Sequence, residues 1–350
     1  MAMMRHFYES ARDIHVIGAG SLLEIMIRDE QKSFPVGRIE YLFMYPLTFE
    51  EYLAAIGAEQ ALEFYNTVPL PDLAFTALRA HFHRYALLGG MPEIVNVYLQ
   101  REDIATLAIV YQGLLTSYLD DVSKYARNAT MAEVIRHVVE AAPLEAGKRI
   151  KFDGFGQSKY KSREVGEALR TLERAMLVYL QYPTSTTEPP ILPNKRKSPK
   201  LQFLDTGLIN YYVGLQEQFF KHEDLSSIYR GILAEHLTGQ ELLASDPTRQ
   251  SKLSFWTREK RQSRAEVDFL VQHGEYVIPV EVKSGTTGTL RSLHEFVDRA
   301  PHPYAVRVFG NALNLNLNAS TRSGRSYRLL NLPHFLTGKI QDYLRWFLAA

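Results

Sequence analysis

The fold of the C-terminal part is decided by Glu266-Val267-Asp268-Phe269-Leu270 and, further along, by Pro279-Val280-Glu281-Val282-Lys283. Both segments are short apolar runs with β-branched residues, a pattern that predicts two neighbouring strands. Residues two apart on a strand project to the same face, so we expect Glu281 and Lys283 to point together. A hairpin between the two strands would bring Asp268 to the same edge.

These side chains suit metal-assisted chemistry on phosphate esters. Two carboxylates at one strand end are hard oxygen ligands of the kind that Mg²⁺ prefers. A metal ion there could polarise a phosphodiester, and Lys283 could orient the attacking water and stabilise developing charge. Glu235, on the helix predicted before these strands, is the natural third acid. The alternative is a surface hairpin whose salt bridge contributes only ~0–1 kcal/mol.

This pattern resembles the PD-(D/E)xK nuclease superfamily, whose core is a helix and a mixed sheet with Asp and Glu-x-Lys at the site. The resemblance implies catalytic roles for Glu235, Asp268, Glu281 and Lys283. It also implies a Mg²⁺ ion held by Asp268, Glu281 and the backbone carbonyl of Val282. A fold can persist after its chemistry is lost, so a non-catalytic module that binds DNA or a protein remains the alternative.

Composition limits the remaining choices. The chain has 350 residues, of which 46% are hydrophobic and 23% charged, as in an ordinary globular protein. This length suggests roughly two or three domains. The absence of cysteine excludes disulfides, thiolate catalysis and Cys-ligated metal sites. The sequence shows neither a membrane-spanning apolar run nor a secretory signal, so we expect a cytoplasmic protein without a membrane partner.

Charge is unevenly distributed although the net charge is only +1. Residues 1–120 are acidic overall, and residues 121–200 are basic, which favours the middle of the chain for phosphate contacts. Residues 130–215 predict two helices and then two strands joined by a long loop, the order of a winged helix-turn-helix. The residues expected to contact DNA are Lys195, Arg196 and Lys197 in the wing and Arg163 at a helix start. The alternative for the wing is a solvated surface loop.

A wider resemblance covers almost the whole chain. Gly18-Ala19-Gly20-Ser21, Gly89-Gly90-Met91-Pro92 and Leu204-Asp205-Thr206-Gly207 resemble, in this order, motifs of prokaryotic AAA-type ATPases that carry a C-terminal nuclease-like domain of uncharacterised function. The resemblance implies that Ser21 and Arg38 are remnants of nucleotide-sensing positions.

The phosphate-binding loop of such ATPases, G-x-x-x-x-G-K-[ST], and their acidic Mg²⁺ strand are both missing. Backbone amides of that loop supply most of the grip on nucleotide, so we expect no ATP binding or hydrolysis by this chain. The strand predicted at residues 14–17 would lack its sheet neighbours. Residues 1–56 should therefore be poorly packed, rearranged or held by a partner; the alternative is that the chain is a fragment of a longer ATP-binding protein.

The resulting fold class is α/β and α+β multidomain: a truncated AAA+ remnant with a helical lid, a winged helix and a PD-(D/E)xK nuclease-like α/β domain. The predicted domains are residues 1–56, 57–124, 125–215 and 216–350, in that order. We expect DNA as the main partner, with a protein partner or self-association as further candidates.

Local patterns add several expectations. Strands are predicted at residues 14–17 and 39–45, and Thr48 is expected to cap a helix. Residues 311–326, rich in Asn and Ser, are expected to be loose. A helix is expected from a stripe of residues that recur at i, i+4 spacing with one three-residue step: Leu73, Ala77, His81, Tyr85 and Leu88.

Overall fold

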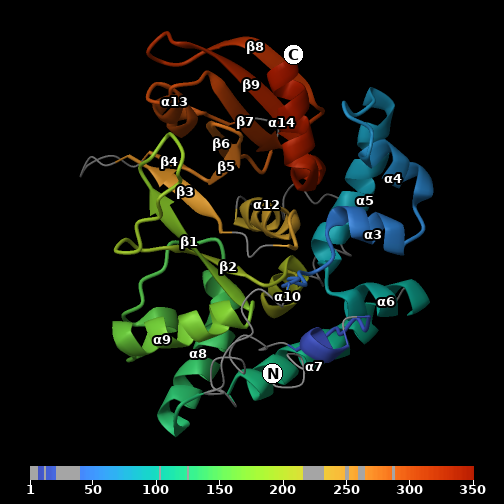
Figure 1. The fold of residues 1–350 in the computed structure, drawn as a ribbon, viewed down its shortest axis with the longest axis vertical. Helices are drawn as coiled ribbons and strands as arrows, with labels where there is room; N and C mark the ends of the chain where they lie inside the picture. Colours follow the sequence, from blue (N-terminus) through green and yellow to red (C-terminus); the bar gives the residue numbers. More distant parts are fainter. Residues whose placement is uncertain are drawn as a thin grey trace.

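The protein is α+β, with helices in the first half of the chain and two mixed sheets in the second (Figure 1). The structure is a computed structural model that describes residues 7–11, 13–20, 40–101, 104–123, 126–215, 232–248, 252–258, 265–285 and 288–350. Within these ranges, none of the helices combines the length and apolar character that a membrane crossing needs. The mixed, multi-part fold class expected from the sequence is confirmed at this level.

The first helical part follows its local sequence signals. Its helices are α3 (Phe49–Ala55), α4 (Glu59–Tyr65), α5 (Phe75–Leu88), α6 (Pro92–Arg101) and α7 (Ile104–Ser123), with a 3₁₀ turn, η1 (Asp72–Ala74), before α5. Thr48 caps α3 as predicted: its Oγ1 accepts from the Glu51 nitrogen at 3.2 Å, and Glu51 Oε2 accepts from the Thr48 nitrogen at 2.8 Å. Gly89 ends α5 with a φ of 75°, which glycine adopts without steric cost.

The middle part contains a helix pair and a strand hairpin. It is built from α8 (Ala129–Glu145), η2 (Phe155–Gln157), α9 (Ser162–Arg174), β1 (Val178–Thr184), β2 (Lys200–Phe203) and α10 (Thr206–Tyr212). Strands β1 and β2 pair antiparallel, in the register Val178 with Phe203. The predicted order of two helices and a long-looped hairpin is therefore present.

The C-terminal part adds a helix, a mixed sheet and covering helices. Its elements are α12 (Ile232–Ala244), β3 (Ser254–Thr257), β4 (Glu266–Val267), β5 (Phe269–His273), β6 (Tyr276–Val282), α13 (Arg291–Val297), β7 (Tyr304–Phe309), β8 (Asn314–Ser320), β9 (Ser326–Pro333), η4 (His334–Lys339) and α14 (Ile340–Ala349). The five-stranded sheet has the order β5-β6-β7-β9-β8. In it, α13 connects the parallel strands β6 and β7, and β5 pairs antiparallel with β6.

The second sheet is shared between the middle and C-terminal parts. Its order is β2-β1-β3-β4, and β1 and β3 pair in parallel through Tyr182 with Ser254 and Thr184 with Trp256. Two of its strands thus precede residue 215 and two follow it. The domain boundary predicted at residues 215 and 216 consequently divides the strands of a single sheet.

A buried polar junction connects the helical part to α10 and α12. Asp205 caps α10 and accepts from the Gly90 nitrogen at 2.7 Å, and a Cβ on Gly207 would lie 2.0 Å from the Leu88 carbonyl. Beside it, Glu241 Oε1 lies 2.7 Å from the Tyr85 hydroxyl and 3.0 Å from the Phe49 nitrogen. The motifs around Gly89-Gly90 and Asp205-Thr206-Gly207 therefore serve as packing contacts between elements.

Three local predictions were wrong. No strand forms at residues 14–17 or 40–45. Ile17 is 95% exposed and Leu42 is 76% exposed, and neither apolar run has, among the described residues, the sheet neighbours that a buried strand needs. Residues 311–326 contain the edge strand β8, because an edge strand needs one partner only and leaves its Asn side chains in solvent. The adjoining β9, with which β8 pairs, was also missed.

The predicted stripe on α5 is displaced by one residue at its start. Leu73 and Ala77 are exposed, and Ala74, Leu78 and Phe82 are buried instead. Tyr85 and Leu88 are buried as expected. The spacing of apolar residues predicts that a helix has a buried face. It does not decide which of two adjacent apolar residues lies on that face.

Candidate active site

Asp268 stands between the two sheets. Strand β4 ends at Val267, which pairs with Trp256 of β3, and β5 begins at Phe269, which pairs with Val280 of β6. If the β5–β6 register is continued by one residue, Asp268 lies opposite Glu281. Asp268 Oδ2 accepts from the Val282 nitrogen at 2.9 Å. Its own carbonyl accepts from Gln181 of β1 at 2.7 Å, so both sheets hold this residue.

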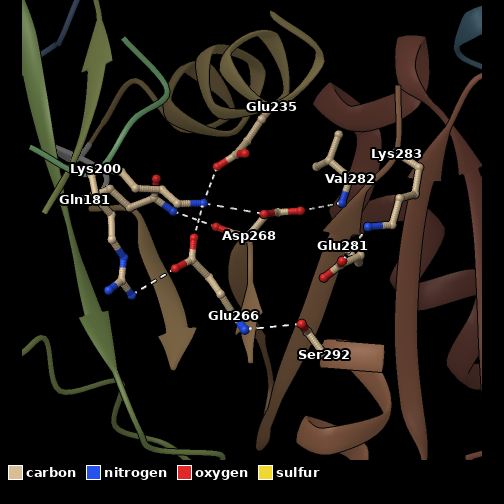
Figure 2. Close-up of polar contacts among 10 residues, drawn as sticks. Gln181, Lys200, Glu235, Glu266, Asp268, Glu281, Val282, Lys283 and Ser292 are labelled. Carbon is tan, nitrogen blue, oxygen red and sulfur yellow. Dashed lines mark hydrogen bonds and ion pairs between the residues drawn. The ribbon is translucent and has the colours of Figure 1, made fainter. Parts of the chain in front are cut away.

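Lys283, the residue directly after β6, projects to the same side as Glu281, as the alternation of an extended segment requires. Lys283 Nζ is 2.6 Å from Glu281 Oε1 (Figure 2). Glu281 is only 5% exposed, and its Oε2 is buried without a hydrogen-bond partner among the described residues. The backbone of Lys283 is fixed on both sides: its nitrogen donates to the Val308 carbonyl at 2.8 Å, and its carbonyl lies 3.0 Å from His334 Nε2.

A second lysine, absent from the sequence-based prediction, stands at the centre of the acids. Lys200 of β2 forms an ion pair with Glu235 of α12, and its Nζ is 2.7 Å from Glu266 Oε1 and 3.5 Å from Asp268 Oδ1. Figure 2 shows the three carboxylates converging on this ammonium group. Its side chain is 7% exposed. Arg149 extends the network to the outside through Glu266 Oε2 at 2.9 Å.

Burial shifts the ionisation of the whole group. Desolvation raises the pKa values of Glu235, Asp268 and Glu281, and repulsion from neighbouring carboxylates adds to the increase for all three. Burial alone would lower the pKa of Lys200, but the attraction of the surrounding carboxylates outweighs burial and raises it. Lys200 is therefore a permanent cation at neutral pH, facing acids that are held less firmly in their charged form.

Two family models match this chain. Residues 79–218 match DUF8612, a domain of unknown function. Residues 230–332, which include Glu235, Asp268, Glu281 and Lys283, match DUF4143, a domain of unknown function often found alongside AAA ATPase domains. Neither a curated protein nor a solved structure matches the chain.

The donor set around Asp268 fits a hard divalent cation in its chemistry. Asp268 and Glu281 supply carboxylate oxygens, and the unpartnered Glu281 Oε2 is a buried acceptor that a cation would satisfy. In the part of the chain that the structure describes, however, no group of three or more His, Cys, Asp or Glu side chains is placed to hold a metal ion. The acids that do converge meet on Lys200 instead.

The remaining predicted positions are separate from this cluster or outside the described residues. Lys195, Arg196 and Lys197 are exposed in the turn before β2, which the Asn194 side chain closes by accepting from the Arg196 nitrogen at 3.1 Å. Arg163 is exposed in the first turn of α9. Ser21 and Arg38 lie outside the described residues.

Sequence reasoning missed Lys200 and Glu266, although each left a signal. In the sequence, Lys200 opens the apolar run Lys200-Leu201-Gln202-Phe203-Leu204, and a lysine in a strand that the structure buries throughout needs acidic partners. Glu266 stands two residues before Asp268 and so projects to the same side of an extended segment.

Proposed function

We propose that the C-terminal part of this chain is a nuclease-like phosphodiesterase that uses a divalent metal ion and acts on DNA. The observation that carries the proposal is the meeting of Asp268, Glu281 and Lys283 at one place on adjacent strands, with Lys283 Nζ 2.6 Å from Glu281 Oε1. The order α12, β5-β6 hairpin, α13 and parallel β7 supports it, because the PD-(D/E)xK core resembled by the sequence is likewise a helix with a mixed sheet.

The chain's own residues would divide the work as follows. Asp268 and Glu281 would hold the metal ion, which when bound polarises the phosphodiester and acidifies a water molecule. The hydrogen bond from the Val282 nitrogen fixes the orientation of Asp268. Lys283 would orient the attacking water and stabilise the negative charge that develops on the phosphate. Burial of the site strengthens each of these electrostatic contributions.

The resemblance to AAA-type ATPases indicates the kind of protein from which this chain would descend. Motifs such as Gly89-Gly90 and Asp205-Thr206-Gly207, together with the DUF4143 match, support descent from an AAA-associated family. We expect no ATP hydrolysis by this chain, because the phosphate-binding loop is missing from its sequence.

The proposal is tested by incubating the protein with supercoiled plasmid and MgCl₂ or MnCl₂. Asp268→Asn and Lys283→Ala should each abolish nicking, and Arg345→Ala, a change at an exposed ion pair on α14, should leave it intact. Asp268→Asn is preferred to Ala because an amide oxygen can still accept from the Val282 nitrogen. Nicking that persists in both site variants would assign it to a contaminant and sink the proposal.

A second candidate is a DNA-binding module without catalysis. It is favoured by the exposed wing residues Lys195, Arg196 and Lys197. Salt-sensitive DNA binding with no cleavage under any divalent metal would support this candidate over the nuclease.

A further inference from the structure

Lys200 reaches the candidate active site from another part of the fold. It is the first residue of β2, which belongs to the hairpin of the middle part, whereas Glu235, Glu266 and Asp268 follow residue 230. The parallel pairing of β1 with β3 carries β2 to this position. The Lys200 ammonium group also lies over the Phe255 ring of β3, with Nζ 5.2 Å from the ring centroid.

The ammonium group of Lys200 is the cation on which the buried acids converge. Three carboxylates face Lys200 Nζ, those of Glu235, Glu266 and Asp268. Asp268 is also one of the two proposed metal ligands. Acids brought together in a buried place repel one another unless a cation lies among them. The Lys200 ammonium group offsets the repulsion among these carboxylates. A metal ion bound beside it would be repelled by the positive charge of the lysine.

We propose that Lys200 is a built-in competitor of the divalent metal ion. With the lysine in place, Glu235, Glu266 and Asp268 are neutralised internally and metal affinity is low. Without the lysine charge, Asp268 becomes available to hold the ion together with Glu281. This inference rests on the proposed function and adds a form of control to it. It also accounts for acids of a nuclease-like pattern that converge on an amine.

The test measures Mn²⁺ affinity directly, by titrating the full chain with MnCl₂ and recording free Mn²⁺ by electron paramagnetic resonance. Lys200→Met removes the charge and keeps most of the apolar stem, so it should bind Mn²⁺ at least ~10-fold more tightly than the wild type. Lys200→Arg keeps a cation and should not gain affinity. Lys339→Met, which removes a lysine paired with Glu50 rather than with the acids of the site, is the matched control and should equal the wild type.

A second pair of variants covers the case in which Lys200→Met does not fold. Glu235→Gln lowers the number of buried carboxylates, so Lys200→Met combined with Glu235→Gln should fold more readily than Lys200→Met alone. The double variant should then bind Mn²⁺ more tightly than Glu235→Gln by itself. Circular dichroism and a melting curve establish the folded state of each variant, and Mn²⁺ should raise the melting temperature most where Lys200 is absent.

The outcomes separate this inference from the proposed function. Unchanged or weaker Mn²⁺ binding after loss of Lys200 overturns the competitor role, even if the wild type cleaves DNA. Tighter binding without cleavage by any variant supports the competitor role and removes the nuclease proposal.

Discussion

Asp268 Oδ2 accepts a 2.9 Å hydrogen bond from the backbone nitrogen of Val282, so the residue that separates the two sheets is anchored to the second strand of the larger one. This bond has a structural role whether or not the site is catalytic. It satisfies a donor at the end of β6, beyond the Phe269–Val280 pair that ends the β5–β6 ladder.

The Asp268–Val282 bond predicts different costs for two substitutions. Asp268→Ala leaves the Val282 nitrogen without its acceptor and should lower the free energy of unfolding by about 1–3 kcal/mol. Asp268→Asn keeps an acceptor oxygen and removes one of several crowded negative charges, so its cost should be below about 1 kcal/mol. Urea denaturation followed by circular dichroism measures both. Equal losses for the two variants would show that the carboxylate charge, not the hydrogen bond, matters.

Glu241 predicts a pH-dependent contribution to stability. Burial raises its pKa from 4.5 to about 7, with Tyr85 and the Phe49 nitrogen as its partners. A carboxyl with a raised pKa in the folded state stabilises fully below the unfolded value of 4.5, and this contribution is lost as pH rises through 7. The full loss corresponds to about 3 kcal/mol.

Glu241→Gln isolates this effect from other titrating groups, since buried His236, with a pKa lowered to about 3 by burial, acts in the opposite direction. The variant should match the wild type near pH 5 and become the more stable of the two by pH 8. Melting temperatures across this range give the comparison. A constant difference between the two proteins at every pH would contradict the assignment.

The contact between Gly207 and the end of α5 predicts a steric effect. A Cβ at Gly207 would lie 2.0 Å from the Leu88 carbonyl and 2.9 Å from the Gly89 nitrogen, and backbone atoms cannot rotate away. Gly207→Ala should therefore destabilise by at least about 2 kcal/mol. Gly113→Ala in α7, where the added Cβ meets open space, should instead stabilise by about 0.5–1 kcal/mol. Thermal denaturation of both variants checks the pair, and a tolerated Gly207→Ala would mean that the two elements separate readily.

The exposed wing predicts the salt dependence of DNA binding. Replacing Lys195, Arg196 and Lys197 together by Ala removes three candidate phosphate contacts, which should reduce the slope of log affinity against log salt by roughly 2–3. Fluorescence anisotropy with a labelled duplex at several salt concentrations measures the slope. Arg345→Ala, a similarly exposed cation on α14, should leave it unchanged. An unaltered slope in the triple variant would place any DNA contacts elsewhere.

The sequence predicted features that depend on neighbours close in the chain. Thr48 and Glu51 cap α3 within one turn, and Asp268 meets Glu281 because a single short hairpin joins their strands. Such contacts follow from spacing and local propensity alone. For this reason the sequence could predict the order of the helices, the β1–β2 hairpin and the pairing of Glu281 with Lys283.

Features that depend on distant pairing were not accessible. Lys200 reaches Glu235, Glu266 and Asp268 only because β1 runs parallel to β3, and no periodicity in either segment encodes that partner. The same limit explains the strand predicted wrongly at residues 14–17, since an apolar run indicates a strand only when a sheet receives it. Strand β8 was missed because its Asn-rich sequence is typical of a loop, whereas an edge strand can expose such side chains to solvent.

The four-stranded sheet also has a practical consequence for anyone who divides this protein for expression. Fragments cut to the family matches, residues 79–218 and 230–332, would place β1 and β2 in one polypeptide and β3 and β4 in the other. Each piece would expose an unpaired strand edge, β1 in the first and β3 in the second, and unpaired edges promote aggregation. The first piece would also contain Lys200 without the acidic residues that neutralise it. If the chain must be divided, the two pieces should be co-expressed, so that β1 and β3 can pair again.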